Sequence, residues 1–207
     1  MAAARHRTST KLTSVERILE RTIEVIEKGG EAAIRTNTIA GECGVTPPIL
    51  YRAFGSREGL VVAAQAERYR RSSALAAAYV IAQIESASSG AELRTNIEEA
   101  LSFVFGPERA SGRLLRAEVI GSAVSRPALR EALVLIDAEY ADRIAGAFAE
   151  SVRRGWVNPE VNLRAVALWA HGVVTSRVGC EFGQPDDLTA ESARLSVSAI
   201  LHAIFGN

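Results

Sequence analysis

The sequence predicts an all-α protein with a small N-terminal helical unit and a larger helical bundle after it. Apolar residues recur at helical spacing, and no segment shows the sustained alternation of a β-strand. Glycine, proline or serine marks the breaks between the helical segments. A chain of 207 residues is long enough for two compact units, expected at residues 1–56 and 57–207.

The first helix is predicted to begin after Thr13 and to end at Gly29-Gly30. Thr13 and Glu16 have the spacing of a capping box, and the two glycines favour a helix end. The face expected to be buried carries Val15, Ile18, Leu19, Thr22, Ile23 and Ile26.

The second helix is short, with Thr36 as its expected N-cap and Gly44 at its end. Gly44 can adopt the left-handed conformation that a tight turn between helices requires. In the third helix, Leu50 and Phe54 are four residues apart and are expected to face the core, with Ile39 and Ala40 opposite.

Several signals mark the start of the third helix. Thr46 is a favourable N-cap, Pro47 suits the first helical position, and Val45 can pack on Leu50. Pro48 has no N–H, so the Thr46 hydroxyl is expected to cap Ile49 instead.

Longer helices follow, with Gly55 ending the third helix and Ser56 capping the fourth. Asn158 and Pro159 are expected to form a cap and first turn. The expected helices are residues 57–85, 91–105, 107–123, 127–154, 159–181 and 189–205.

Two short helices joined across Cys43-Gly44-Val45-Thr46 have the geometry of a helix-turn-helix. In that motif the second helix, here near residues 47–54, lies in the DNA major groove with its first residues at the base edges.

The run from Thr36 to Leu60 resembles the signature of the TetR family of transcription regulators. The matching elements are an opening Thr, Ile-Ala, Gly-Val-Thr, Leu-Tyr-x-x-Phe, and Arg-Glu followed by Leu. The run departs from the signature at Cys43, Pro47-Pro48, Ala53 and Gly59. The resemblance implies DNA contacts from Thr36, Asn37, Thr46, Pro47, Pro48, Tyr51, Arg52 and Arg57.

The chemistry of these residues agrees with that implication. Thr36 and Arg57 lie at predicted helix N-termini, which favour a phosphate. Tyr51 offers a hydroxyl to a phosphate, and Arg52 offers a planar guanidinium. The alternatives are a core aromatic for Tyr51 and a solvated surface charge for Arg52.

The distribution of charged residues gives weaker support for DNA binding by the N-terminal unit. The formal net charge is zero, from 24 basic and 24 acidic residues. Residues 1–60 carry nine basic and seven acidic side chains, a net of +2. Arg5, Arg7 and Lys11 precede the first helix without an acid and are expected to form a DNA-contacting arm, the alternative being an unstructured terminus.

Other function classes lack support in the sequence. Cys43 and Cys180 form no disulfide framework or zinc pattern, and Cys43 is expected to be a small packing residue. His171 and His202 have no ligand-spaced partners, and no catalytic or phosphate-binding motif occurs, so we expect no enzyme, metal or cofactor. No segment resembles a signal peptide or membrane span, so a cytoplasmic protein is expected.

The bundle is expected to enclose an apolar pocket for a small, uncharged or weakly charged hydrophobic effector. The candidate lining residues are Phe103, Glu118, Tyr140, Trp169 and His171. We interpret the chain as a DNA-binding regulator, and specifically as a repressor that this effector releases from its operator. The alternatives are a C-terminal unit that only dimerises or binds a protein, and, more remotely, a helical-bundle enzyme.

The last two helices are expected to form a homodimer interface. Small residues at steps of three or four allow close approach of helices, and two copies would give an isologous four-helix contact. The candidate interface residues are Gly172, Ser176, Ser192, Ser196, Ala199 and Ala203. Such a dimer requires a pseudo-palindromic DNA operator.

Overall fold

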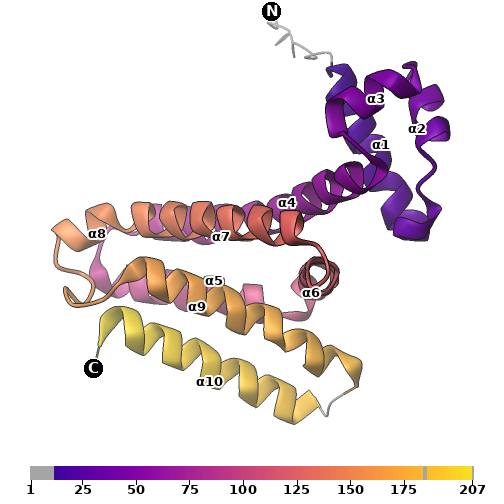
Figure 1. Ribbon diagram of the computed structural model, residues 1–207. Helices are drawn as coiled ribbons and strands as arrows, with labels where there is room; N and C mark the ends of the chain where they lie inside the picture. Colours follow the sequence, from indigo (N-terminus) through magenta and orange to yellow (C-terminus); the bar gives the residue numbers. More distant parts are fainter. Residues whose placement is uncertain (1–11, 184–185, 207) are drawn as a thin grey trace, which may run out of the picture. The chain divides into compact units, whose positions relative to one another are not determined.

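The computed structural model describes residues 12–183 and 186–206, and within these ranges it is helical without a strand (Figure 1). The chain divides into two compact units after Gln65. The expected basic arm with Arg5, Arg7 and Lys11 lies outside the described residues.

The first unit contains a three-helix core and the start of a long fourth helix. The elements are α1 (Ser14–Gly29), η1 (Glu31–Ala33), α2 (Thr36–Glu42), α3 (Pro47–Phe54) and the first turns of α4 (Arg57–Glu85). Ile18, Ile39, Leu50 and Leu60, one from each α-helix, are fully or almost fully buried together. The Thr13–Glu16 capping box is confirmed, as is the helix end at Gly30.

Three local expectations in this unit are wrong. Val15 is 46% exposed, because the buried face of α1 begins only at Ile18. Arg35, not Thr36, is the N-cap of α2. The Thr46 hydroxyl makes no capping bond; instead, the Thr46 carbonyl accepts from the Ile49 amide at 2.9 Å.

The second unit is a bundle formed by the rest of α4 and the helices after it. Its further elements are α5 (Gly90–Phe105), η2 (Pro107–Arg109), α6 (Ala110–Ala123), α7 (Pro127–Ala147), α8 (Ala149–Arg153), α9 (Leu163–Ser176), η3 (Arg177–Phe182) and α10 (Asp186–Phe205). α9 packs against α7 and α10, and α10 also packs against α5 (Figure 1). Apolar side chains from α4, α5, α7, α9 and α10 form one core.

Two of the long helices differ from the expected ones. The expected helix 127–154 is interrupted at the buried Phe148, which separates α7 from α8. The expected start at Asn158-Pro159 is also wrong. The Asn158 amide donates to the Ile204 carbonyl at 2.9 Å, the Asn158 side chain caps only Glu160, and α9 begins later with Asn162 as its N-cap.

Candidate nucleic-acid interface and ligand cavities

The turn between α2 and α3 has the geometry that the sequence predicts. Gly44 has a φ of +67°, in the left-handed region that favours glycine. The Val45 amide donates to the Ala40 carbonyl at 3.0 Å, which closes the turn directly after α2. The two short helices are therefore held as a helix-turn-helix.

α3 has one buried face and one exposed face. Leu50 is fully buried and Phe54 packs partly against the same core, as expected. Tyr51 is 41% exposed, and Arg52 is exposed beside it. The core alternative for Tyr51 therefore does not describe this structure.

Most of the implied DNA-contacting residues lie at the start of α2, at the start of α3 and along the exposed face of α3. The Tyr51 hydroxyl lies 3.0 Å from the Thr36 hydroxyl, which links the exposed face of α3 to the start of α2. Asn37, Thr46 and Pro48 are exposed, whereas Pro47 is half-buried.

Arg57 has a structural contact that the sequence does not predict. Its guanidinium donates to the Glu31 carbonyl at 2.7 Å and to the Ile34 carbonyl at 3.4 Å. At the same helix start, the Ser56 hydroxyl accepts from the Gly59 amide at 2.9 Å, which confirms Ser56 as the cap. A Cβ at position 59 would lie 2.0 Å from the Phe54 carbonyl oxygen, so this backbone packing requires glycine.

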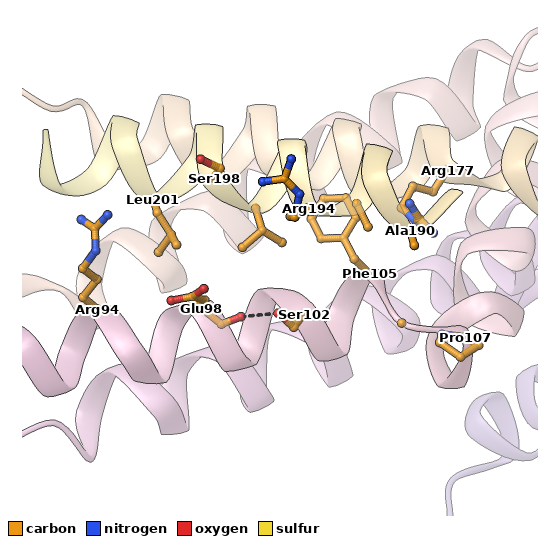
Figure 2. Close-up of a pocket in the computed structure, with 13 residues that line it drawn as sticks. Arg94, Glu98, Ser102, Phe105, Pro107, Arg177, Ala190, Arg194, Ser198 and Leu201 are labelled. Atoms are coloured by element: carbon orange, nitrogen blue, oxygen red, sulfur yellow. Dashed lines mark hydrogen bonds between the residues drawn. The ribbon is translucent and has the colours of Figure 1, made fainter. Parts of the chain in front are cut away.

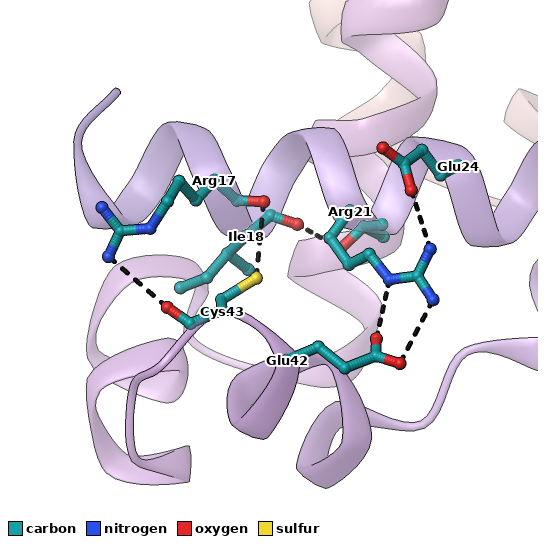
Figure 3. Close-up of polar contacts among 7 residues, drawn as sticks. Arg17, Ile18, Arg21, Glu24, Glu42 and Cys43 are labelled. Atoms are coloured by element: carbon teal, nitrogen blue, oxygen red, sulfur yellow. Dashed lines mark hydrogen bonds and ion pairs between the residues drawn. The ribbon is translucent and has the colours of Figure 1, made fainter. Parts of the chain in front are cut away.

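Polar contacts connect α1 to the end of α2 (Figure 3). The Cys43 thiol donates to the Arg17 carbonyl at 3.5 Å, and burial raises the pKa of this thiol. Burial thus favours the protonated thiol over the reactive thiolate, in agreement with a packing role. Arg21 pairs with Glu24 on its own helix and with Glu42 at the end of α2, each at 2.7 Å, and the second pair adds a contact between the two helices.

The second unit contains a small apolar cavity. Its volume is about 50 Å³. Its walls come from α4, α5, α7, α9 and α10, and from Phe148 between α7 and α8. Most of the lining side chains are aliphatic, and Tyr140 is the one that carries a hydroxyl. The cavity thus offers mainly apolar contacts, with a polar group at one place.

A buried polar cluster lies next to Tyr140. The His171 ring is 4.4 Å from the Tyr140 ring, centroid to centroid. The Tyr69 hydroxyl donates to Asp137 at 2.9 Å and lies 3.3 Å from His171 Nε2. Tyr140 and His171 are both candidate pocket residues from the sequence, and the structure brings these two together.

Burial sets the protonation of this cluster. Burial first, and the positive charge of Arg116 second, lower the pKa of His171 to about 3. Burial raises the pKa of Asp137, although the Tyr69 hydrogen bond and Arg116 oppose that rise. His171 is consequently neutral at pH 7, so its 3.6 Å approach to Asp137 is not an ion pair.

The other candidate pocket residues lie elsewhere. Phe103 is 36% exposed and its ring packs tilted against that of Tyr79, with 4.5 Å between the ring centroids, and Trp169 is 45% exposed. The expectation that Glu118 lies among apolar neighbours is wrong, because its side chain is 53% exposed and pairs with Arg68 at 3.0 Å. The structure therefore does not bring Phe103, Trp169 and Glu118 together with Tyr140 and His171.

Sequence reasoning missed two buried arginines on α6. Arg113 is 1% exposed and donates to the carbonyls of Val104 and Gly106 while pairing with Glu181. Arg116 is 2% exposed and donates to the Thr175 hydroxyl at 3.2 Å. A signal was present in the sequence, because both arginines share a helical face with the apolar Val119.

The predicted dimer stripes are accessible on both helices. Gly172, Ser176, Ser192 and Ala199 are exposed, and Ser196 and Ala203 are half-buried. A Cβ added at Gly172 would meet no atom within 4 Å, so space is open above this part of α9.

Within residues 12–183 and 186–206, no group of three or more His, Cys, Asp or Glu side chains is placed to hold a metal ion. Among the same residues, no helix has both the length and the apolar character needed to cross a membrane.

Comparison with known proteins agrees with this arrangement. Residues 18–64 match the family model described as bacterial regulatory proteins, tetR family. A structure assigned to the TetR-family transcriptional regulators, from Rhodococcus sp., is 25% identical over 92% of this chain and 98% of its own, with a TM-score of 0.63.

Two more distant structures share the fold. The multidrug binding protein EbrR, complexed with imidazole, is 23% identical over 94% of this chain and 96% of its own, with a TM-score of 0.56. Bacillus subtilis FadR, in complex with stearoyl-CoA, is 17% identical over 92% of this chain and 98% of its own, with a TM-score of 0.51. Among curated proteins, none matches the chain.

The helix-turn-helix and the all-helical second unit define a DNA-binding transcription regulator. Residues 18–64 match the tetR family of bacterial regulatory proteins, and the whole chain is similar in fold to a TetR-family regulator of known structure. Proteins of this family regulate transcription and are not enzymes.

Proposed function

We propose that the protein is a homodimeric repressor that a small hydrophobic effector releases from a pseudo-palindromic operator. The observation that carries the DNA-binding part is the exposed α3 face, with Tyr51 and Arg52 outward and Leu50 buried. α3 would enter the major groove, where Arg52 can contact a base edge or phosphate and Tyr51 a phosphate. Asn37, Thr46 and Pro48 would add contacts around it.

The effector is proposed to bind in the apolar cavity beside Tyr140 and His171. A cavity of about 50 Å³ is smaller than ligand pockets of roughly 300–1,000 Å³, so binding must widen it. The ligands of EbrR and FadR, two proteins of the same fold, support ligand binding by the second unit. The aliphatic walls favour an uncharged or weakly charged ligand.

We propose that the effector releases the protein from DNA by shifting the populations of two states that differ in the tilt of α4. This helix supplies Leu60 and Val61 to the core of the first unit, and Ala76 and Val80 to the cavity wall in the second. An effector that prefers a state with α4 tilted would lower the affinity for DNA. Equal affinity for both states would produce no release.

The operator can be sought first by an electrophoretic shift on the DNA flanking the protein's own coding region. Candidate effectors come from a thermal-stability screen of hydrophobic small molecules. Linkage then gives the test, since operator DNA must weaken effector binding by the same factor by which effector weakens DNA binding. Equal effector affinity with and without operator, for every ligand that binds, would support the alternative of a unit that only dimerises or binds a protein.

A further inference from the structure

A groove of about 620 Å³ lies between α5 and α10, apart from the apolar cavity (Figure 2). One face of α5 forms one wall and one face of α10 forms the other, with η3 and the start of η2 at one end. The polar lining side chains are Arg94, Glu98, Ser102, Arg177, Arg194 and Ser198. The volume lies in the range of ligand pockets, roughly 300–1,000 Å³.

Arg177 is the unusual residue of this groove. It is 9% exposed, its Nη1 donates to the Thr189 carbonyl at 3.1 Å, and its guanidinium lies 5.7 Å from the Phe105 ring centroid. Its Nε is buried without a hydrogen-bond partner, and in the described part of the chain the guanidinium forms no ion pair. A buried cation with an unmatched donor favours an anionic partner.

The charges along the groove are unevenly placed. Arg94, Arg177 and Arg194 oppose one carboxylate in the lining, that of Glu98, for a net charge of +2. Arg194 already pairs with Glu191, which lies outside the lining, so the net charge that remains for a ligand is +1. Glu98 precedes Phe105 by seven residues, which is about 10 Å along the helix axis, so the acid is distant from the Phe105 end where Arg177 lies.

The base of the groove is apolar. Phe105, Val197 and Leu201 all line it, and each is less than a tenth exposed. We propose that this groove binds an amphipathic organic anion, with its carboxylate or phosphate at Arg177 and its apolar chain on these three side chains. The lining between Arg94 and Phe105 covers about 16 Å of helix axis, which suits an extended chain.

This site is independent of both the proposed effector cavity and the proposed dimer contact. Arg194 is two residues from Ser192 and from Ser196, and side chains two apart on a helix point in nearly opposite directions. A dimer through Ser192 and Ser196 would therefore leave the groove open.

Four ten-carbon probes can test the proposal by calorimetric titration: decanoate, decyl phosphate, decanol and decyltrimethylammonium. Both anions should bind at least tenfold more tightly than the alcohol and the cation, and their relative affinities show which head group Arg177 prefers. Decanol binding as tightly as decanoate would overturn the proposal.

Variants locate the site. Ala190→Trp fills the groove from an exposed position and should abolish decanoate binding without unfolding, while Arg177→Gln should weaken it at least tenfold. Glu98→Gln is the matched control and should leave binding equal or tighter. If Ala190→Trp binds decanoate like the parent, or if only Ala170→Leu in the apolar cavity loses binding, the groove is not the site.

Discussion

The hydroxyl of Tyr51 on α3 lies 3.0 Å from the hydroxyl of Thr36 at the start of α2. This hydrogen bond connects two residues that the family resemblance assigns to DNA contact, and it restricts the Tyr51 ring on an otherwise exposed helix face. If Tyr51 contacts DNA as proposed, this restriction in the free protein would reduce the ordering cost of binding.

Tyr51→Ala and Arg52→Ala should each weaken operator binding by about 1–3 kcal/mol, because each removes a contact from the exposed face of α3. Arg52→Ala should change the free energy of unfolding by no more than about 0.5 kcal/mol, whereas Tyr51→Ala should lower it by about 0.5–1.5 kcal/mol because it also removes the hydrogen bond to Thr36. Shift assays at matched salt measure the first effect and urea unfolding the second. Tyr51→Phe separates the hydroxyl from the ring, and parental affinity in both alanine variants would refute the contact assignment.

Gly44→Ala should lower the free energy of unfolding by about 1–2 kcal/mol, because position 44 has a φ of +67° that L side chains adopt only with strain. Gly41→Ala is a matched control three residues away, within α2, where an added Cβ meets nothing within 4 Å. This control should be neutral or stabilising. Equal destabilisation of both variants would mean that the turn conformation is not the cause.

Acid should destabilise the protein through His171, which faces Tyr69 from α4, Asp137 and Tyr140 from α7, and the charge of Arg116 from α6. The folded pKa of about 3 is below the unfolded value of about 6.5, so the unfolded chain binds more protons between these pH values. The free energy of unfolding therefore falls as pH decreases from 6.5, by at most about 1.4 kcal/mol per pH unit from this group.

His171→Gln removes that titration and should give a shallower decrease than the parent between pH 6.5 and pH 4.5 in urea unfolding. Asp137, whose raised pKa acts in the opposite direction, is present in both proteins. Parallel pH profiles would show that His171 is not buried as a neutral group.

Ala199→Glu should convert a dimer to monomers and abolish operator binding, because two carboxylates would meet across the two-fold axis of the proposed α9–α10 interface. Light scattering and shift assays measure the two effects. Val124→Glu, at a position 72% exposed after α6, is the control and should change neither. A parent protein that is monomeric at micromolar concentration would exclude this interface.

Deletion of residues 1–10 should flatten the dependence of log affinity on log salt, because Arg5 and Arg7 would no longer displace counterions from DNA. Affinity measured across a salt series tests this expectation. An unchanged slope would assign no DNA contact to this segment.

The sequence by itself determined the local features of the first unit. Gly44 provides the left-handed turn, Thr13 and Glu16 the first cap, and the four-residue spacing of Leu50 and Phe54 the inner face of α3. Each of these depends on the preferences of residues a few positions apart, which a sequence displays directly.

Only the tertiary structure decided the rest. The start of α9 shifted to Leu163 because the Asn158 amide bonds to Ile204, nearly fifty positions away. Likewise Arg113 and Arg177 resemble surface charges in the sequence, yet carbonyls from other elements hold them inside the bundle. The carbonyl partners of Arg113 and Arg177 lie seven to twelve positions away, on neighbouring elements, and reach the guanidinium groups only when the helices pack. The helical face that Arg113 shares with Val119 is a sign of its burial, but it does not identify these partners.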